Sequence, residues 1–389
     1  MKQKRRVLFL LFFLLFLLVA APCVHAEDLG LDEDLQGYYE QQMEESGAND
    51  LPAALPEETR SALSGLGVEG ADWASITSIT PEALYNQVAG MVGEASKNPL
   101  KVALSVVAVI LLCAFMNGVK SSFQERTMSS VAGLVGTLCI CVLVVQPLVA
   151  CIEKVTVVIN TAAGFLLACV PVLAAIMLAA GQTAGAGSFQ MIMMAVGNTV
   201  TLLSSTILAP LMNIFLAFSV VGTVSPSVNL SGISNSFSKA VKWILTFCMT
   251  IFSGLLTIHG LVTSAVDSTG ARAARFMVSS FVPVVGGALG EALGTITGCV
   301  KMIKSGVTAF GLLAEGALFL PVLLECVLWQ LTLWVCVGIG QIFELKEITD
   351  LLSAAGKVME TLLAILLCTM AVLTISSVVM LMLGGGTAA

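Results

Sequence analysis

The feature that most constrains this chain is a succession of apolar runs that begins at Leu100 and continues almost to the C-terminus. A membrane-spanning helix needs about 20 consecutive apolar residues, and several of these runs are that long. Only 11% of the 389 residues are charged, whereas soluble domains average about 25%. Because lipid offers no hydrogen bonds to an open backbone, the sequence predicts an all-α, polytopic helical membrane protein.

Hydropathy divides the membrane-like region into single spans and longer tracts. Two tracts, 188–225 and 305–343, exceed one bilayer crossing, and each contains a proline near its centre. Each tract is compatible with two short helices, a re-entrant hairpin or one long kinked helix. We expect about seven to nine membrane-embedded helices in total. The expected single spans are 100–117, 130–151, 156–179, 243–265 and 361–384, and the expected helix breaks are at Pro171, Pro210, Pro283 and Pro321.

Two further segments are less hydrophobic than the spans. Residues 344–357 are short and amphipathic, which favours a helix lying on the membrane surface. Residues 267–303 are rich in glycine and either cross the membrane or lie in its interface.

The N-terminus has the pattern of a secretory signal peptide. A basic stretch at residues 2–6 precedes a continuous apolar run at 7–21. Val24-His25-Ala26 then places small residues at the −3 and −1 positions before Glu27. We therefore expect residues 1–26 to be removed, with an uncleaved anchor helix as the alternative.

Residues 27–98 form a short acidic segment that the signal peptide would place outside the cytoplasm. This segment holds 15 of the 25 acidic residues, opposed there only by Arg60 and Lys97. Such a charge balance argues against nucleic-acid binding, which needs basic patches. Thr80-Pro81-Glu82 supplies an N-cap, a first-turn proline and an acid, so we expect a helix from about residue 81 to 95.

The remainder, residues 99–385, is expected to be one multi-span membrane domain. If residue 27 is outside, the first span runs inward and the loop with Lys120 and Arg126 is cytoplasmic, in agreement with the positive-inside rule. Basic residues on either side of the 243–265 span favour opposite topologies for the 188–225 tract. The topology after about residue 180 therefore stays open.

Two stretches of the membrane domain suggest an internal repeat, residues 168–212 and 280–323. Met191-Ile192 recurs as Met302-Ile303, and Pro210 recurs as Pro321, both at an offset of 111 residues. Chance similarity between apolar stretches is the competing explanation. Duplicated segments with interrupted helices are typical of transporters, although they also suit a symmetric scaffold.

No pattern in the sequence indicates catalysis or cofactor binding. The chain contains no HExxH zinc motif, no nucleophile elbow and no phosphate-binding loop. His259 ends an apolar helix, and Cys139 and Cys141 have no second pair at metal-ligand spacing. We expect no enzyme, no catalytic residues, no metal and no cofactor.

The most specific local pattern is a glycine every fourth residue. On a helix this spacing makes one nearly continuous stripe, against which another helix backbone can approach closely. The competing interpretation is a poorly helical segment, since each glycine weakens a helix. We favour helix packing, with a partner helix in the same chain or in another subunit. The stripe consists of Gly286, Gly290, Gly294 and Gly298.

Three glutamates lie in or beside the apolar tracts: Glu291, Glu315 and Glu325. A carboxylate in lipid is costly, so it should face a cavity, a partner or an aqueous path. They are therefore candidates for pore-lining or ion-coupling acids, with Arg272 and Arg275 as partners. The alternative is that they lie near an interface because the helices are short and broken.

Two segments carry a resemblance to a known family. Residues 269–294 read TGARAARFMVSSFVPVVGGALGEALG, a basic patch followed by a VPVVG turn and a glycine-rich helix. Residues 304–323 read KSGVTAFGLLAEGALFLPVL. With the signal peptide, short ectodomain and multi-span domain, these segments resemble the stage III sporulation protein AE family of endospore-forming bacteria. The ectodomain matches in length and position only.

This resemblance implies a membrane subunit of the secretion-like channel complex that links mother cell and forespore and is required for endospore formation. Members lie in the mother-cell membrane around the forespore. The implied partners are the other stage III A operon proteins (an ATPase, ring-forming and membrane subunits), a forespore channel protein and membrane lipid, with a homo-oligomer left open. The family prescribes no catalytic residues, and it leaves the exported substrate undefined.

The alternative function is a stand-alone secondary transporter built on the repeat. A transporter predicts that acids such as Glu315 are essential and that the purified chain moves a solute unaided. A channel subunit predicts that mutations abolish assembly and that the chain alone transports nothing.

Overall fold

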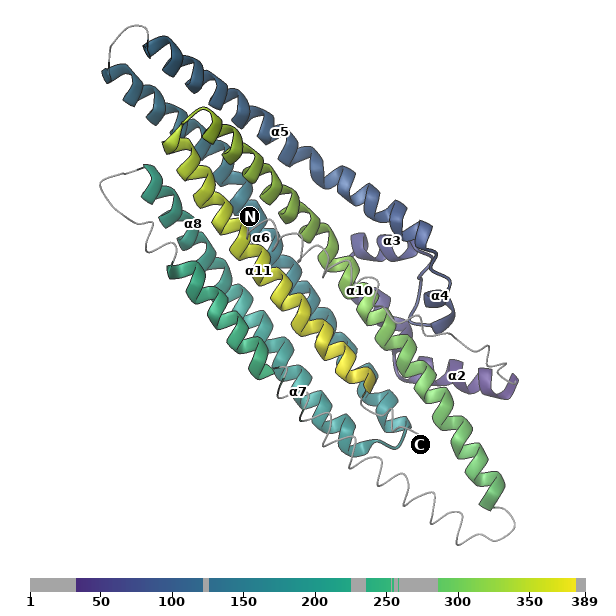
Figure 1. Ribbon diagram of the computed structural model, residues 1–389. Coiled ribbons are helices and arrows are strands. Elements are labelled where there is room, and N and C mark those ends of the chain that lie inside the picture. The colour runs from purple at the N-terminus through teal and green to yellow at the C-terminus, as the bar shows by residue number, and fades with distance from the viewer. Residues whose placement is uncertain are drawn as a thin grey trace. The chain divides into compact units, whose positions relative to one another are not determined.

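A computed structural model describes residues 33–121, 126–224, 236–252, 254, 258 and 286–382 (Figure 1). The chain divides into two compact units, residues 1–38 and 39–389. All regular structure in the described residues is helical, which confirms the predicted fold class. The expected signal peptide, the proline at 283 and the C-terminal part of the expected span at 243–265 lie outside these residues.

The acidic N-terminal segment forms four short helices. They are α2 (Glu33–Glu45), the 3-10 helix η1 (Ala48–Ala54), α3 (Glu57–Gly65) and α4 (Trp73–Thr77). The Asp72 carboxylate caps α4 by accepting a hydrogen bond of 2.9 Å from the Ser75 N–H. Leu51, Leu55 and Leu63 are buried. Because α3 and α4 contact α10 and η1 contacts α6, this segment packs on the membrane helices.

Helix α5 (Pro81–Ser121) begins where the sequence predicts. The Ala83 N–H donates to the Thr80 hydroxyl at 3.3 Å, so Thr80 is the N-cap and Pro81 the first helical residue. The helix then continues through Pro99, across the predicted domain boundary at residue 98. The helix expected at 81–95 and the span expected at 100–117 are therefore one element.

Helix α6 (Arg126–Ala179) joins two predicted spans, 130–151 and 156–179, in the same way. A tight turn follows, in which Gly181 adopts a φ of 75° and the Gln182 N–H donates to the Met177 carbonyl at 2.9 Å. This is the left-handed helix end for which glycine is suited.

Beyond this turn lie α7 (Thr183–Leu202), the π-helix η2 (Leu203–Leu208) and α8 (Ala209–Val224), which follow one another without a gap. Helix α7 packs against α6, whereas α8 packs mainly against α11. Among the four prolines, Pro210 is the one beside a described irregularity, because η2 ends two residues before it.

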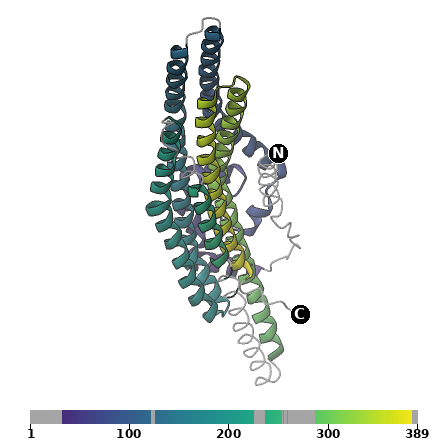
Figure 2. The same cartoon turned by 60° about the vertical axis from the view of Figure 1, so that its left-hand side comes forward.

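The C-terminal part is a long helical hairpin of α10 (Gly286–Ile342) and α11 (Lys346–Met382), which run side by side in Figures 1 and 2. Glu344 adopts a φ of 55° in the turn, and the Leu345 N–H donates to the Gly340 carbonyl at 3.1 Å. Helix α10 also packs against α5 and α6. Between α8 and α10, residues 236–252 are helical.

Three expectations about local structure are corrected. Helices α6 and α10 continue through Pro171 and Pro321, so these residues do not break them. In a bundle, neighbouring helices and local adjustment satisfy the groups that a proline frees. The 305–343 tract is thus a single helix.

The surface helix expected at 344–357 is instead the start of α11, with Leu345, Ile348, Leu351 and Leu352 buried. Its apolar face packs within the bundle and not on lipid headgroups, because the tight turn after α10 folds it back along that helix.

The proposed repeat is not visible as a repeated structure. The first stretch contains the turn at Gly181, whereas the matching residues of the second stretch lie inside the continuous helix α10.

Five described stretches are long and apolar enough to cross a membrane. They are Pro81–Met116, Val135–Ala179, Gly185–Gly222, Gly298–Ile342 and Lys346–Val378. The prediction of more embedded helices depends partly on residues outside the described ranges. A helix of 45 residues is about 68 Å long, and a bilayer core is only about 30 Å thick.

The close approach of α6 and α7 gives a first prediction. A Cβ at Gly197 would lie 2.6 Å from Leu167 Cδ2, whereas one at Gly187 would meet nothing within 4 Å. We expect Gly197→Ala to destabilise the protein by about 1–3 kcal/mol through overpacking, offset by at most about 1 kcal/mol of helix propensity.

The matched control is Gly187→Ala on the same helix, for which we expect no loss of stability. Thermal unfolding of the detergent-solubilised full-length chain measures both variants. Equal stability of the two variants would contradict the packing of α7 on α6.

Candidate polar sites within the helical bundle

Helices α6 and α10 are joined by an ion pair within their apolar stretches. Lys154 Nζ lies 2.8 Å from both carboxylate oxygens of Glu325. The Glu325 side chain is 18% exposed and that of Lys154 is 50% exposed. An intramembrane carboxylate needs such a partner. The structure thus pairs Glu325 with a lysine, and the possible partners Arg272 and Arg275 lie outside the described residues.

Two thiols lie next to this ion pair. The Cys151 and Cys326 side chains, from α6 and α10, are close enough to interact with each other. Both residues are buried. They are one turn or less from Lys154 and Glu325 along their own helices, so one level of the α6–α10 contact carries both interactions.

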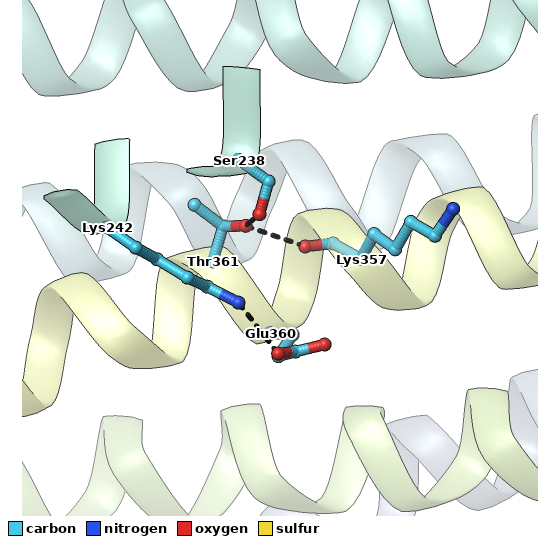
Figure 3. Close-up of polar contacts among 5 residues, drawn as sticks. All are labelled: Ser238, Lys242, Lys357, Glu360 and Thr361. Carbon is cyan, nitrogen blue, oxygen red and sulfur yellow. Dashed lines mark hydrogen bonds and ion pairs between the residues drawn. The ribbon is translucent and has the colours of Figure 1, made fainter. Parts of the chain in front are cut away.

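A second ion pair joins α11 to the helix over residues 236–252 (Figure 3). Lys242 Nζ donates to Glu360 Oε1 at 2.7 Å, and each side chain is 38% exposed. One turn away, the hydroxyl groups of Ser238 and Thr361 are 2.8 Å apart, and Thr361 also donates to the Lys357 carbonyl. The helix over residues 236–252 is therefore held to α11 by polar interactions and not by shape complementarity alone.

Sequence reasoning missed Lys154, Lys242 and Glu360 as members of the bundle. Lys154 lay at an assumed boundary between two spans, and Glu360 at an assumed start of the last span. The available signal was that Lys154 and Glu360 are flanked by long apolar runs with few other charges. Such a charge is expected to find an opposite charge on another helix.

Glu315 has different surroundings from the paired glutamates. It is 6% exposed, and its Oε1 lies 2.9 Å from the Thr374 hydroxyl on α11. Its carboxyl group lines a cavity between α6, α10 and α11. The structure thus places Glu315 beside a cavity and next to a hydroxyl group, and its role as a pore-lining or ion-coupling acid stays a prediction. The third predicted acid, Glu291, lies in α10, but its side chain is outside the described residues.

The glycine stripe lies in the first four turns of α10. Gly298 is exposed, and a Cβ added there would meet no described atom within 4 Å. The side-chain surroundings of Gly286, Gly290 and Gly294 are outside the described residues. Close helix packing along this stripe stays a prediction.

The helical bundle is similar to a known protein family over nearly its whole length. Residues 74–384 match the family model described as Stage III sporulation protein AE. The chain belongs to this family. The match begins within α4 and contains every ion pair and the cavity described above.

A curated relative agrees with this assignment. It is the "Stage III sporulation protein AE" of Bacillus subtilis (strain 168), 25% identical over 207 residues. The alignment covers 53% of this chain and 52% of the relative, so the chain spans about half the length of the curated protein it matches. No solved structure matches the chain. The protein is therefore a sporulation-family protein with several apolar, membrane-inserted helices.

The Lys242–Glu360 pair gives a second prediction. Reversing one charge, as in Glu360→Lys, should lower the amount of folded protein in the membrane. An uncompensated charge at the centre of a membrane helix costs about 2.5–3.5 kcal/mol on insertion scales. The double variant Lys242→Glu with Glu360→Lys should recover most of the loss, measured as membrane-inserted protein and thermal stability.

The control is Glu94→Lys in the charged first half of α5, where the side chain is exposed. Exposed charges contribute about 0–1 kcal/mol, so little change is expected. A double variant as unstable as the worse single variant would show that the two side chains do not meet.

Proposed function

We propose that this chain is a membrane subunit of the secretion-like channel complex between mother cell and forespore, required for endospore formation. The observation that carries the proposal is the family match over residues 74–384, which includes all the described long helices. The family name itself specifies sporulation. The channel role is an inference from what the resemblance implies.

The architecture supports a structural role in a membrane assembly. Long helices are fixed to one another by two interhelical ion pairs and a hairpin of α10 on α11. The short acidic helices pack against α6 and α10, which would connect any partner bound there to the membrane helices. No catalytic step is part of the proposal, and no enzyme activity is expected.

The proposed location is the mother-cell membrane around the forespore, with the acidic segment outside the cytoplasm after signal cleavage. The proposed partners are the other proteins of the stage III A operon, including an ATPase and ring-forming subunits, and a forespore channel protein. The glycine stripe of α10 is the proposed contact for one of these subunits or for a second copy. No described atom lies within 4 Å of a Cβ at Gly298, which is compatible with a partner in another chain.

For the alternative, a stand-alone secondary transporter, one structural observation is favourable and another is unfavourable. The cavity beside Glu315 is the kind of site a transporter would use. The interrupted helices expected at Pro171 and Pro321 are not present, since both prolines lie inside continuous helices.

The proposal predicts the outcome of a co-purification from sporulating cells. A tagged full-length chain, crosslinked in the membrane, should recover the operon partners. Gly290→Leu and Gly294→Leu should lose them, because a leucine side chain keeps a neighbouring helix from approaching the stripe. Gly187→Leu is the control, since that position of α7 faces open space.

Two results would count against the channel role. The first is recovery of the chain without partners, together with normal sporulation of a deletion strain. The second is transport of a solute by the purified chain alone in liposomes, which would favour the transporter.

A further inference from the structure

The buried carboxyl group of Glu315 lies in a cavity with room for about one small occupant. The cavity volume is about 20 Å³, and a water molecule needs roughly 10–15 Å³ or more on the same measure. Most of the lining is apolar. The polar lining groups are the Glu315 carboxyl, the hydroxyls of Thr308 and Ser377, and the Cys169 thiol.

The hydrogen bonds of Thr374 show how this carboxyl group can be satisfied in two states. The Thr374 hydroxyl oxygen lies 2.9 Å from Glu315 Oε1 and 2.9 Å from the Met370 carbonyl. A hydroxyl has one hydrogen and two lone pairs, so it cannot donate fully to both acceptors. If it donates to Met370, it can accept a hydrogen bond from a protonated Glu315. If it rotates, it donates to a Glu315 carboxylate.

The charged neighbours of Glu315 do not fix one of these states. On α10, Lys304 lies eleven residues before Glu315, about 16 Å along the helix axis. Glu325 lies ten residues after Glu315 and is already paired with Lys154. On α6 the titratable lining group is Cys169. On α11, residues 361–378 contain no Asp, Glu, Lys, Arg or His.

Two glutamates of the bundle that form ion pairs provide an internal comparison. Glu325 and Glu360 each lie within 2.8 Å of a lysine ammonium group. Each of these carboxyl groups therefore has a cationic partner at hydrogen-bond distance. Glu315 instead meets a hydroxyl group, and an isolated carboxylate in an apolar cavity is costly without a proton or a cation.

We propose that Glu315 is a reversible proton-binding site in the α6–α10–α11 bundle, with the cavity admitting the water that exchanges the proton. The proton moves between that water and a Glu315 carboxylate oxygen, while the Thr374 hydroxyl rotates to match. No other bond forms or breaks. The inference does not depend on the proposed channel role, since it concerns this chain alone.

The first test is modification by dicyclohexylcarbodiimide, an apolar reagent that adds to protonated carboxyl groups. The carboxyl proton passes to a carbodiimide nitrogen, and the carboxylate oxygen bonds to the central carbon, so the whole reagent is retained. The full-length chain in lipid nanodiscs is treated from about pH 5 to pH 9, above the ordinary glutamate range of about 4.3. Peptide mass spectrometry then locates the label.

We expect label on Glu315 and much less on Glu325 or Glu360. Labelling should fall about tenfold per pH unit above the midpoint of titration. Equal labelling of all three glutamates would overturn the proposal. Protection of Glu315 by sodium ions at constant pH would also overturn it, because the cavity would then be a metal-cation site.

Infrared difference spectroscopy tests the site without relying on reagent access. A pH jump should produce the C=O band of a protonated carboxyl group in the native chain. Glu315→Gln, a neutral mimic of the protonated state, should fold and lack this band. Glu315→Asp should shift the band, since the carboxyl group is retained on a shorter side chain. A band unchanged in both variants, or absent from the native chain, would overturn the proposal.

Discussion

The rest of this structure depends on the cost of an unpaired charge in lipid. The chain carries few charges after residue 100, and four of them form two ion pairs between helices. Lys154 with Glu325 fixes α6 against α10, and Lys242 with Glu360 fixes α11 against the helix over 236–252. Apolar packing alone would let such helices slide past one another. The two ion pairs select one relative position, because each has to meet its opposite charge.

Glu315 shows how this constraint can be met in a second way. Its environment supplies a hydroxyl group and a cavity in place of an ammonium group. The same helix thus carries one glutamate that is paired with a lysine and another that meets a hydroxyl group beside a cavity. A protein that served only as a rigid scaffold would need only glutamates that are paired with a lysine.

The sequence predicted the helical membrane class and the capped start of α5 at Pro81, and it named Glu315 as an acid of interest without fixing its surroundings. It did not predict which helices are continuous. Glu153-Lys154 and Pro171 look like interruptions in a hydropathy profile, yet α6 passes through both. The partner of Lys154 lies 171 residues further along the chain. Local sequence carries no information on such a contact, and α11 likewise begins earlier than its hydropathy indicates because its first turns are buried by α10.

The π-helix η2 determines how the side chains of α8 are rotated about the helix axis relative to those of α7. A turn with i→i+5 hydrogen bonds holds one more residue than an α-helical turn, and one residue corresponds to about 100° of rotation. The side chains after η2 are therefore out of phase with those before it. The continuous helix can then present its first half, α7, to α6 and its second half, α8, mainly to α11, in agreement with the contacts of the two halves. Deleting a single residue from η2 would leave α7 and α8 almost as long and as apolar as before. It would, however, turn the face of α8 that packs on α11 away from that helix.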